Sequence, residues 1–302
     1  MQEQRKKALV LLNISAGTGR NSEYTLKISR KLAENGYEPV IYPIIPGTDL
    51  VAETLIPEYI GKTDLILCCG GDGTLNHVTE TVMSVQNKPC LAYIPSGSTN
   101  DFARGIGIPA DFEQALEVAV NGRPFKYDVG SLNGTYFNYV AAFGAFSAVS
   151  YATSQEMKNV LGHAAYIINA VGDLYQQINY KCHLKIELED EVLEDDYVFG
   201  AVCNAVSIGG FKMFDDSICL DDGKMELLLI KAPKTPADLQ GILLALSKGG
   251  LSHPSITIRQ ITKARMHADS GTAWSLDGEF GGTHDEINIE VIKNAIEINI
   301  GG

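Results

Sequence analysis

The run Gly70–Thr74, with the sequence GGDGT, has the residue types that could bind the phosphate groups of a nucleotide. Residues 64–69 before it are mostly apolar and predict a short buried strand, and residues 75, 78, 82 and 83 after it are apolar with helical spacing. A strand that turns through glycines into a helix presents backbone N–H groups and the positive end of the helix dipole to an anion. The glycines, which have no Cβ atom, let a phosphate approach the main chain.

The carboxylate of Asp72 would repel a phosphate bound in this turn unless a cation lies between them. Magnesium commonly bridges a carboxylate and phosphate oxygens in such sites. The pattern therefore predicts a magnesium–nucleotide site. The alternative is a glycine-rich strand–helix turn that binds nothing.

Composition limits the classes of function. The chain has 302 residues, enough for two domains of roughly 100–200 residues each. Its 24 basic and 37 acidic residues give a net charge of −13, which argues against a nucleic-acid partner and against strong electrostatic docking on anionic lipid. The six cysteines form no CxxC pair and indicate free thiols in a reducing compartment. Because no apolar run approaches the roughly 20 residues that span a bilayer, we expect a cytoplasmic protein.

Strand-like and helical patterns alternate through residues 1–122. Strands are expected at 7–13, 38–43, 63–69 and 90–94, and helices at about 22–35, 48–59, 74–85, 99–105 and 111–121. The alternation predicts right-handed βαβ units in a doubly wound parallel sheet. Ligands of such sheets bind at the carboxyl ends of the strands. The turns at 13–19, 70–73 and 95–100 are therefore expected to meet at one edge.

The pattern changes after Pro124 to strand-like runs separated by Asn-Gly and Asp-Gly turns. The runs are 125–132, 135–142, 181–189, 195–204, 225–231, 255–260, 262–267, 286–292 and 295–300, with helical patterns at 154–178 and about 236–248. We therefore predict an α/β chain with a nucleotide-binding domain at 1–124 and a mainly antiparallel β-sandwich domain at 125–302. Whether the last strand returns to the first domain stays open.

Five motifs follow one another in the order typical of one enzyme family. They are Asn13–Gly17, Gly70–Asn76, Pro95–Phe102, Asp128–Gly130 and Leu276–Glu279. Together they resemble the soluble bacterial diacylglycerol kinases and related lipid kinases, and sphingosine and ceramide kinases share the same type of catalytic domain. The GGDGT run alone is less specific, because NAD kinases and phosphofructokinases use similar loops. The resemblance extends over the whole chain.

The resemblance implies that ATP and Mg²⁺ bind to the first domain. The residues expected to line the ATP phosphates are Asn13, Ser15, Gly17, Gly70, Gly71, Asp72, Gly73, Thr74, Leu75, Asn76, Ser98 and Asn100. Asp72 is expected to act on the magnesium–phosphate assembly, and Asp128 to belong to the catalytic residues. The alternative for Asp128 is an ordinary turn residue.

Asp277 and Glu279 lie on a tight Asp-Gly turn, where two carboxylates can point toward a common site. By the resemblance, both are catalytic, and Glu279 accepts the proton of the lipid hydroxyl that attacks the γ-phosphate. General-base catalysis of this kind typically supplies about 10²–10⁴-fold, and positioning and metal electrostatics supply the rest. The alternative is an exposed hairpin turn.

Residues 219–224 resemble a structural magnesium site of the bacterial members. The resemblance implies that Asp222 binds the ion through its side chain, and Cys219 and Lys224 through their main-chain carbonyls. Such hard oxygen ligands suit Mg²⁺. The alternative is an ordinary Asp-Gly hairpin.

We expect ATP-dependent phosphorylation of the free hydroxyl of diacylglycerol to phosphatidate, a reaction of phospholipid biosynthesis. The alternatives are a kinase of another lipid or polyprenyl alcohol, an NAD kinase, and a catalytically silent nucleotide or lipid sensor. The lipid would be reached by transient peripheral contact with the membrane. Phe211, Met213 and Phe214 would either insert into the membrane interface or cap the core. A homodimer is an open alternative to a monomer.

Overall fold

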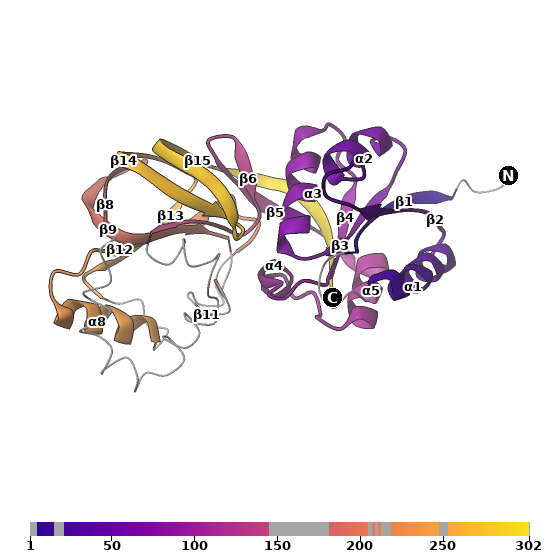
Figure 1. Cartoon of the computed structure of the whole chain (residues 1–302), viewed down its shortest axis with the longest axis horizontal. Coiled ribbons are helices and arrows are strands. Elements are labelled where there is room, and N and C mark those ends of the chain that lie inside the picture. Colours follow the sequence, from indigo (N-terminus) through magenta and orange to yellow (C-terminus); the bar gives the residue numbers. More distant parts are fainter. Residues whose placement is uncertain are drawn as a thin grey trace. The chain divides into compact units, whose positions relative to one another are not determined.

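The computed structural model describes residues 5–14, 21–144, 181–204, 207–208, 211–212, 219–247 and 253–301. The chain forms two compact units, one of Met1–Val129 with Asn294–Gly302 and one of Gly130–Lys293 (Figure 1). The helix expected at 154–178 lies outside the described residues, as does most of the apolar segment at 209–214.

The first unit contains a parallel sheet. Its strands are β1 (Lys6–Asn13), β2 (Tyr37–Ile44), β3 (Leu65–Gly70), β4 (Cys90–Pro95) and the end of β15 (Glu279–Ile300). They lie in the order β15-β4-β3-β1-β2, and every neighbouring pair is parallel. β3 is buried throughout and β1 is buried from Ala8 to Leu12, as expected for strands covered on both faces. The expected parallel sheet is confirmed.

Five helices cover the two faces of this sheet. They are α1 (Asn21–Glu34), α2 (Ala52–Tyr59), α3 (Asp72–Ser84), α4 (Asp101–Gly105) and α5 (Phe112–Asn121). Helices α2 and α3 pack together on one face, and α1 and α5 pack together on the other (Figure 1). Ion pairs between Lys27 and Glu113 and between Lys31 and Glu117 link α1 to α5. This double winding leaves the carboxyl ends of β3 and β4 at one edge of the sheet.

The second unit is mainly antiparallel. Its strands are part of β5 (Arg123–Leu132), then β6 (Thr135–Phe137), β7 (Val140–Gly144), β8 (Cys182–Glu187), β9 (Val192–Cys203), β12 (Met225–Lys231), β13 (Ile256–Ile261), β14 (Lys263–Leu276) and the first part of β15. The main path of pairing is β13-β12-β9-β7-β14-β15, and β8 bridges β9 and β14. A helix, α8 (Pro236–Ser247), follows β12, and a short hairpin joins β10 (Ser207–Ile208) to β11 (Phe211–Lys212).

The second unit has one apolar core cluster, to which nearly all of its strands contribute. Trp274 and Phe143 lie inside it with ring centroids 4.8 Å apart. Figure 1 shows β14 and β15 curving over β9 and β12. The two layers around the core are therefore parts of one continuous hydrogen-bonded sheet. The expected antiparallel character is confirmed, while a sandwich of two separate sheets is not what this pairing shows.

Two strands belong to both units. β5 passes from the first unit into the second at residues 129–130, and β15 returns to the first unit at residue 294. The sequence analysis places the boundary at 124–125 and leaves the return of the last strand open. The runs expected at 286–292 and 295–300 form the single strand β15.

Candidate active site

The GGDGT run forms the junction between β3 and α3. Gly70 ends the strand, Gly71 is the N-cap of α3, and Asp72 is the first helical residue. No side chain caps the helix from Gly71, so the N-terminal N–H groups of α3 are not covered by the N-cap residue. A helix N-terminus of this kind favours the binding of an anion.

The loop that follows β4 contacts this junction directly. A Cβ atom on Gly97 would lie 2.7 Å from the Cα atom of Gly71, a distance that only two glycines permit. The Ser96 N–H donates a hydrogen bond to the Gly70 carbonyl at 2.8 Å. The Asn100 side chain holds Gly97 in place, accepting from its N–H and donating to its carbonyl, both at 2.9 Å. Two of the three turns expected at the sheet edge therefore meet.

Asp72 is connected to the start of α4. Its Oδ2 accepts a hydrogen bond from the Asp101 N–H at 3.1 Å. Asp101 is itself buried and forms an ion pair of 3.1 Å with Arg104, which also donates to the Thr99 carbonyl at 3.0 Å. Asp101 belongs to the Pro95–Phe102 motif but is not among the site residues expected from the sequence. Its position directly after Asn100, at the end of a loop expected to bind phosphate, is the signal that could have found it.

Asn13 connects β1 to the same junction. Its Nδ2 donates to the Thr74 hydroxyl at 2.7 Å. Ser15 and Gly17, which were expected to continue this turn, lie outside the described residues. The side chain of Leu75 is buried. Its N–H donates to the Gly71 carbonyl, so this N–H is already used and does not point freely toward the ATP phosphates that it was expected to bind.

A cavity of about 820 Å³ lies beside the loop after β4. Residues 96–100 form one wall, including the exposed Ser98, and Arg104 contributes to it. Tyr24 and Phe112 form another part of the lining, and their rings are stacked with centroids 3.6 Å apart. The cavity belongs entirely to the first unit.

Asp128 lies within β5 and is fully buried. Its Oδ1 accepts a hydrogen bond from the Asn294 N–H at 2.7 Å, at the point where β15 enters the first unit. Asp128 is therefore a strand residue, and the turn that was its alternative reading is not what the structure has.

In the second unit, Asp277 and Gly278 form the two-residue turn between β14 and β15. Their φ angles of 50° and 91° are those of a type I′ hairpin. The buried Asp277 carboxylate accepts from the N–H groups of Asn138, Tyr139 and Val140 at 2.6, 3.0 and 3.1 Å, and from the Asn138 side chain at 3.0 Å. Glu279 is exposed. The two carboxylates do not share one environment as expected: Asp277 anchors the turn, and Glu279 faces solvent.

The segment 219–224 also forms a turn. Asp222 Oδ1 accepts from the Lys224 N–H at 2.8 Å, and the Asp222 carbonyl accepts from Lys293 Nζ at 3.1 Å. The Cys219 thiol donates to Asp221 at 3.0 Å, an interaction that raises the pKa of Cys219 and keeps the thiol protonated. The described residues contain no group of three or more His, Cys, Asp and Glu side chains suited to a metal. The magnesium site expected here would use one carboxylate and two main-chain carbonyls, so it is not a group of three such side chains.

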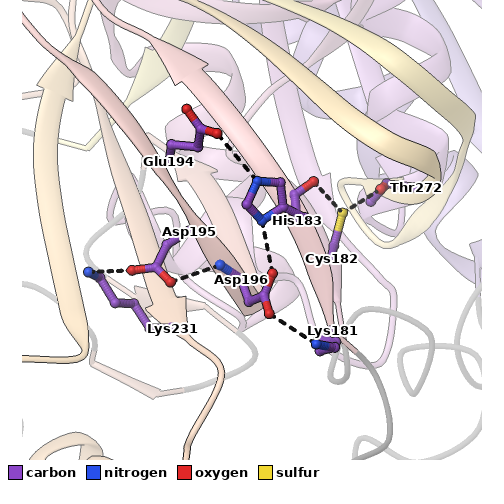
Figure 2. Close-up of polar contacts among 8 residues, drawn as sticks. All are labelled: Lys181, Cys182, His183, Glu194, Asp195, Asp196, Lys231 and Thr272. Carbon is purple, nitrogen blue, oxygen red and sulfur yellow. Dashed lines mark hydrogen bonds and ion pairs between the residues drawn. The ribbon is translucent and has the colours of Figure 1, made fainter.

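A polar cluster that no sequence motif marks lies on β8 and β9. Figure 2 shows His183 between two carboxylates, with Nδ1 2.9 Å from Asp196 and Nε2 3.5 Å from Glu194. The hydrogen bond with Asp196 is the main cause that raises the pKa of His183 above its ordinary value. Lys181 also pairs with Asp196, at 3.0 Å. The spacing of His183 in the sequence is not that of a metal ligand. In the structure, its imidazole pairs with the carboxylates of Asp196 and Glu194.

The sequence and the fold of this chain are similar to those of known proteins. The model of the diacylglycerol kinase catalytic domain matches residues 7–132. A diacylglycerol kinase of Staphylococcus aureus (strain MRSA252) is 31% identical over 281 residues, covering 92% of this chain and 87% of that protein. A diacylglycerol kinase of Bacillus subtilis (strain 168) is 27% identical over 281 residues, covering 92% and 91%.

A solved structure of a diacylglycerol kinase from Bacillus anthracis str. Sterne shares the fold, with a TM-score of 0.75, 21% identity and coverage of 99% of this chain and 98% of that one. The catalytic class defined by these matches is that of the lipid kinases. The chain belongs to the diacylglycerol kinase family. Within the described part of the chain, no helix has the length and apolar character to cross a membrane.

Proposed function

We propose that this enzyme transfers the γ-phosphoryl group of ATP to the free hydroxyl of diacylglycerol, giving phosphatidate and ADP. The single observation that carries the proposal is the main-chain contact of Gly71 with Gly97 at the uncapped N-terminus of α3. This contact brings two loops with glycine, amide and hydroxyl groups to the edge of a parallel sheet where ligands bind. The names of the relatives supply the class of lipid.

The first unit is proposed to hold the ATP phosphates. Gly70–Gly73, Thr74, Asn76, Ser98 and Asn100 contribute N–H, amide and hydroxyl groups, together with Asn13, Ser15 and Gly17. Bound Mg²⁺ would supply electrostatic stabilisation of the charge that develops on the phosphoryl oxygens. The carboxylate of Asp72 fits this ion, because a negative group beside a phosphate loop needs a cation to balance the charge. Asp128 is proposed to support the same unit through its hydrogen bond with Asn294.

Glu279 is proposed to accept the proton of the lipid hydroxyl as the hydroxyl oxygen forms a bond to the γ-phosphorus. The bond from that phosphorus to the bridging oxygen breaks, and ADP leaves. Exposure of Glu279 is consistent with access to a substrate, whereas Asp277 is committed to hydrogen bonds with Asn138, Tyr139 and Val140. We therefore propose that Asp277 is a positioning residue that fixes the turn carrying Glu279.

Residues 219–224 are proposed to hold a second, structural Mg²⁺. The Asp222 side chain and the carbonyls of Cys219 and Lys224 would be its ligands. The thiol of Cys219 would not be a ligand, because Mg²⁺ prefers hard oxygen donors. We also propose that the second unit binds the lipid, that the protein works in the cytoplasm with transient membrane contact, and that a homodimer is compatible with this function.

Transfer of label from γ-³²P ATP to lipids in mixed micelles tests the proposal. The panel contains diacylglycerol, ceramide, sphingosine and a polyprenyl alcohol, with NAD as a soluble acceptor. We expect magnesium-dependent labelling of diacylglycerol above the others. Preferential labelling of another lipid alcohol would show that diacylglycerol is not the preferred substrate. Labelling of NAD would show that the substrate is not a lipid. ATP binding without any transfer would favour a silent sensor.

A further inference from the structure

Glu226 is a buried carboxyl group that the proposed chemistry does not use. It lies in β12, two residues after Lys224, and only 8% of it is exposed. Its Oε1 accepts a hydrogen bond from the Gln260 side chain at 3.2 Å. Its Oε2 is buried and has no hydrogen-bond partner among the residues that the structure describes. A buried carboxyl oxygen without a partner is costly, and oxygens of this kind are commonly satisfied by an ordered water or a bound ion.

The surroundings of Glu226 favour a cation as the source of that partner. Asp222 lies four residues earlier, on the turn that leads into β12. Asp222 uses Oδ1 to accept from the Lys224 N–H. Lys293 contacts the turn through the Asp222 carbonyl, which is not among the proposed ligands.

The coordination chemistry of Mg²⁺ explains why a second carboxylate belongs nearby. Mg²⁺ prefers six oxygen ligands in octahedral geometry and keeps several of its waters. One carboxylate and two carbonyls leave about three positions for water. Each of these waters has hydrogen atoms that need acceptors, and a buried acceptor without a partner holds such a water in place.

We propose that Glu226 is the buried partner of the cation site at residues 219–224, with Oε2 accepting a hydrogen bond from a water on the ion that Asp222 binds. The inference rests on the proposed function, because that function supplies the ion. Glu226 is thereby a positioning residue that acts through the cation.

The strand register connects this site to the turn that carries Glu279. Glu226 pairs with Cys203 of β9, and Cys203 pairs with Val140 of β7. The Val140 N–H donates to the Asp277 carboxylate at 3.1 Å, and the Asp277 N–H donates to the Val140 carbonyl at 2.8 Å. One cross-strand row therefore runs from β12 to β14 across three inter-strand spacings of about 4.8 Å each. An ion bound at the start of β12 would stabilise the end of the sheet that holds the catalytic turn.

Binding of Mg²⁺ alone, without nucleotide, tests the inference by titration calorimetry and by melting temperature in EDTA and in Mg²⁺. The variants are Glu226→Gln, Asp222→Ala and, as a matched control for loss of one negative charge, Glu290→Gln, at an exposed position of the same unit. Loss of an outer partner typically weakens metal binding about 10–100-fold, which we expect for Glu226→Gln. In EDTA this variant should melt no lower than the wild type, because glutamine buries no charge. On addition of Mg²⁺, its melting temperature should rise less than that of the wild type.

The outcomes separate this inference from the proposed function. If Asp222→Ala loses the Mg²⁺ response while Glu226→Gln matches Glu290→Gln and the wild type, the cation site stands and the role of Glu226 is wrong. If the wild type shows no Mg²⁺ response, both the inference and the structural ion fail, while the label-transfer assay still decides on kinase activity. Amide exchange at Tyr139 and Val140 gives a second readout. It should slow on addition of Mg²⁺ in the wild type and change less in Glu226→Gln.

Discussion

Gly71 and Gly97 touch through their main chains, and a Cβ atom on Gly97 would lie 2.7 Å from the Cα atom of Gly71. One glycine caps α3 and the other begins the loop that Asn100 closes. The contact fixes the two proposed phosphate-binding loops against each other. The close approach leaves no room for either loop to move toward the other.

Gly97→Ala should disrupt this contact. Overpacking of a close contact typically costs about 1–3 kcal/mol, and displacement of a phosphate-binding loop by about 1 Å can lower the rate about 100-fold. We expect a lower melting temperature and a kcat/KM for ATP reduced to that extent. Gly105→Ala is the matched control, since a Cβ atom there meets no atom within 4 Å. Equal kinetics for the two variants would show that the contact does not matter.

Glu279 and Asp277 should respond to substitution in different ways. Glu279→Gln removes the proposed base at an exposed position, so kcat should fall by about 10²–10⁴-fold with an unchanged melting temperature.

In the wild type, each of the two Asp277 carboxylate oxygens accepts from two N–H groups. Asp277→Asn replaces one of these oxygens by an NH₂ group, which leaves two of the four donors without an acceptor. Each buried donor left without a partner costs about 1–3 kcal/mol, so the melting temperature should fall. Thermal denaturation and steady-state kinetics of both variants check the contrast. An Asp277→Asn variant as stable as the wild type would contradict the anchoring role of Asp277. A fully active Glu279→Gln variant would show that Glu279 is not the general base.

His183 should make stability depend on pH. Its hydrogen bond with Asp196, with help from Glu194 and the charge of Asp269, raises the pKa of the folded-state imidazole above 6.5. The contribution is therefore fully present below pH 6.5 and is lost as the pH rises through the raised pKa. The difference in melting temperature between the wild type and His183→Gln should be larger at pH 5.5 than at pH 9. Asp196→Asn should abolish most of this dependence, and a difference that grows with pH would contradict the assignment.

The sequence predicts the first unit well because its signals are local. Strand and helix periods alternate there, and the glycine-rich turn at 70–73 lies where the pattern places it, between β3 and α3. The second unit is predicted only as antiparallel. Its continuous sheet depends on long-range pairing, such as that of β8 with β14, which no periodicity records.

The surroundings of individual carboxylates could not be predicted from spacing. Asp277 and Glu279 are one residue apart, yet one is buried against main-chain N–H groups from residues 138–140 and the other is exposed. Asp101 lies within the Pro95–Phe102 motif, but its link to Asp72 arises only because two loops fold against each other. Sequence distance cannot report which loop a carboxylate meets.

Transfer of label from γ-³²P ATP to diacylglycerol by the wild type and by Asp72→Asn tests the central claim most directly. Asparagine keeps the volume of the side chain and an oxygen that can accept from the Asp101 N–H, while it removes the charge that we propose acts on the metal–phosphate assembly. We predict magnesium-dependent phosphatidate formation by the wild type, a rate at least about 100-fold lower for the variant, and equal melting temperatures. Near wild-type transfer by a folded Asp72→Asn enzyme would contradict the site that we propose.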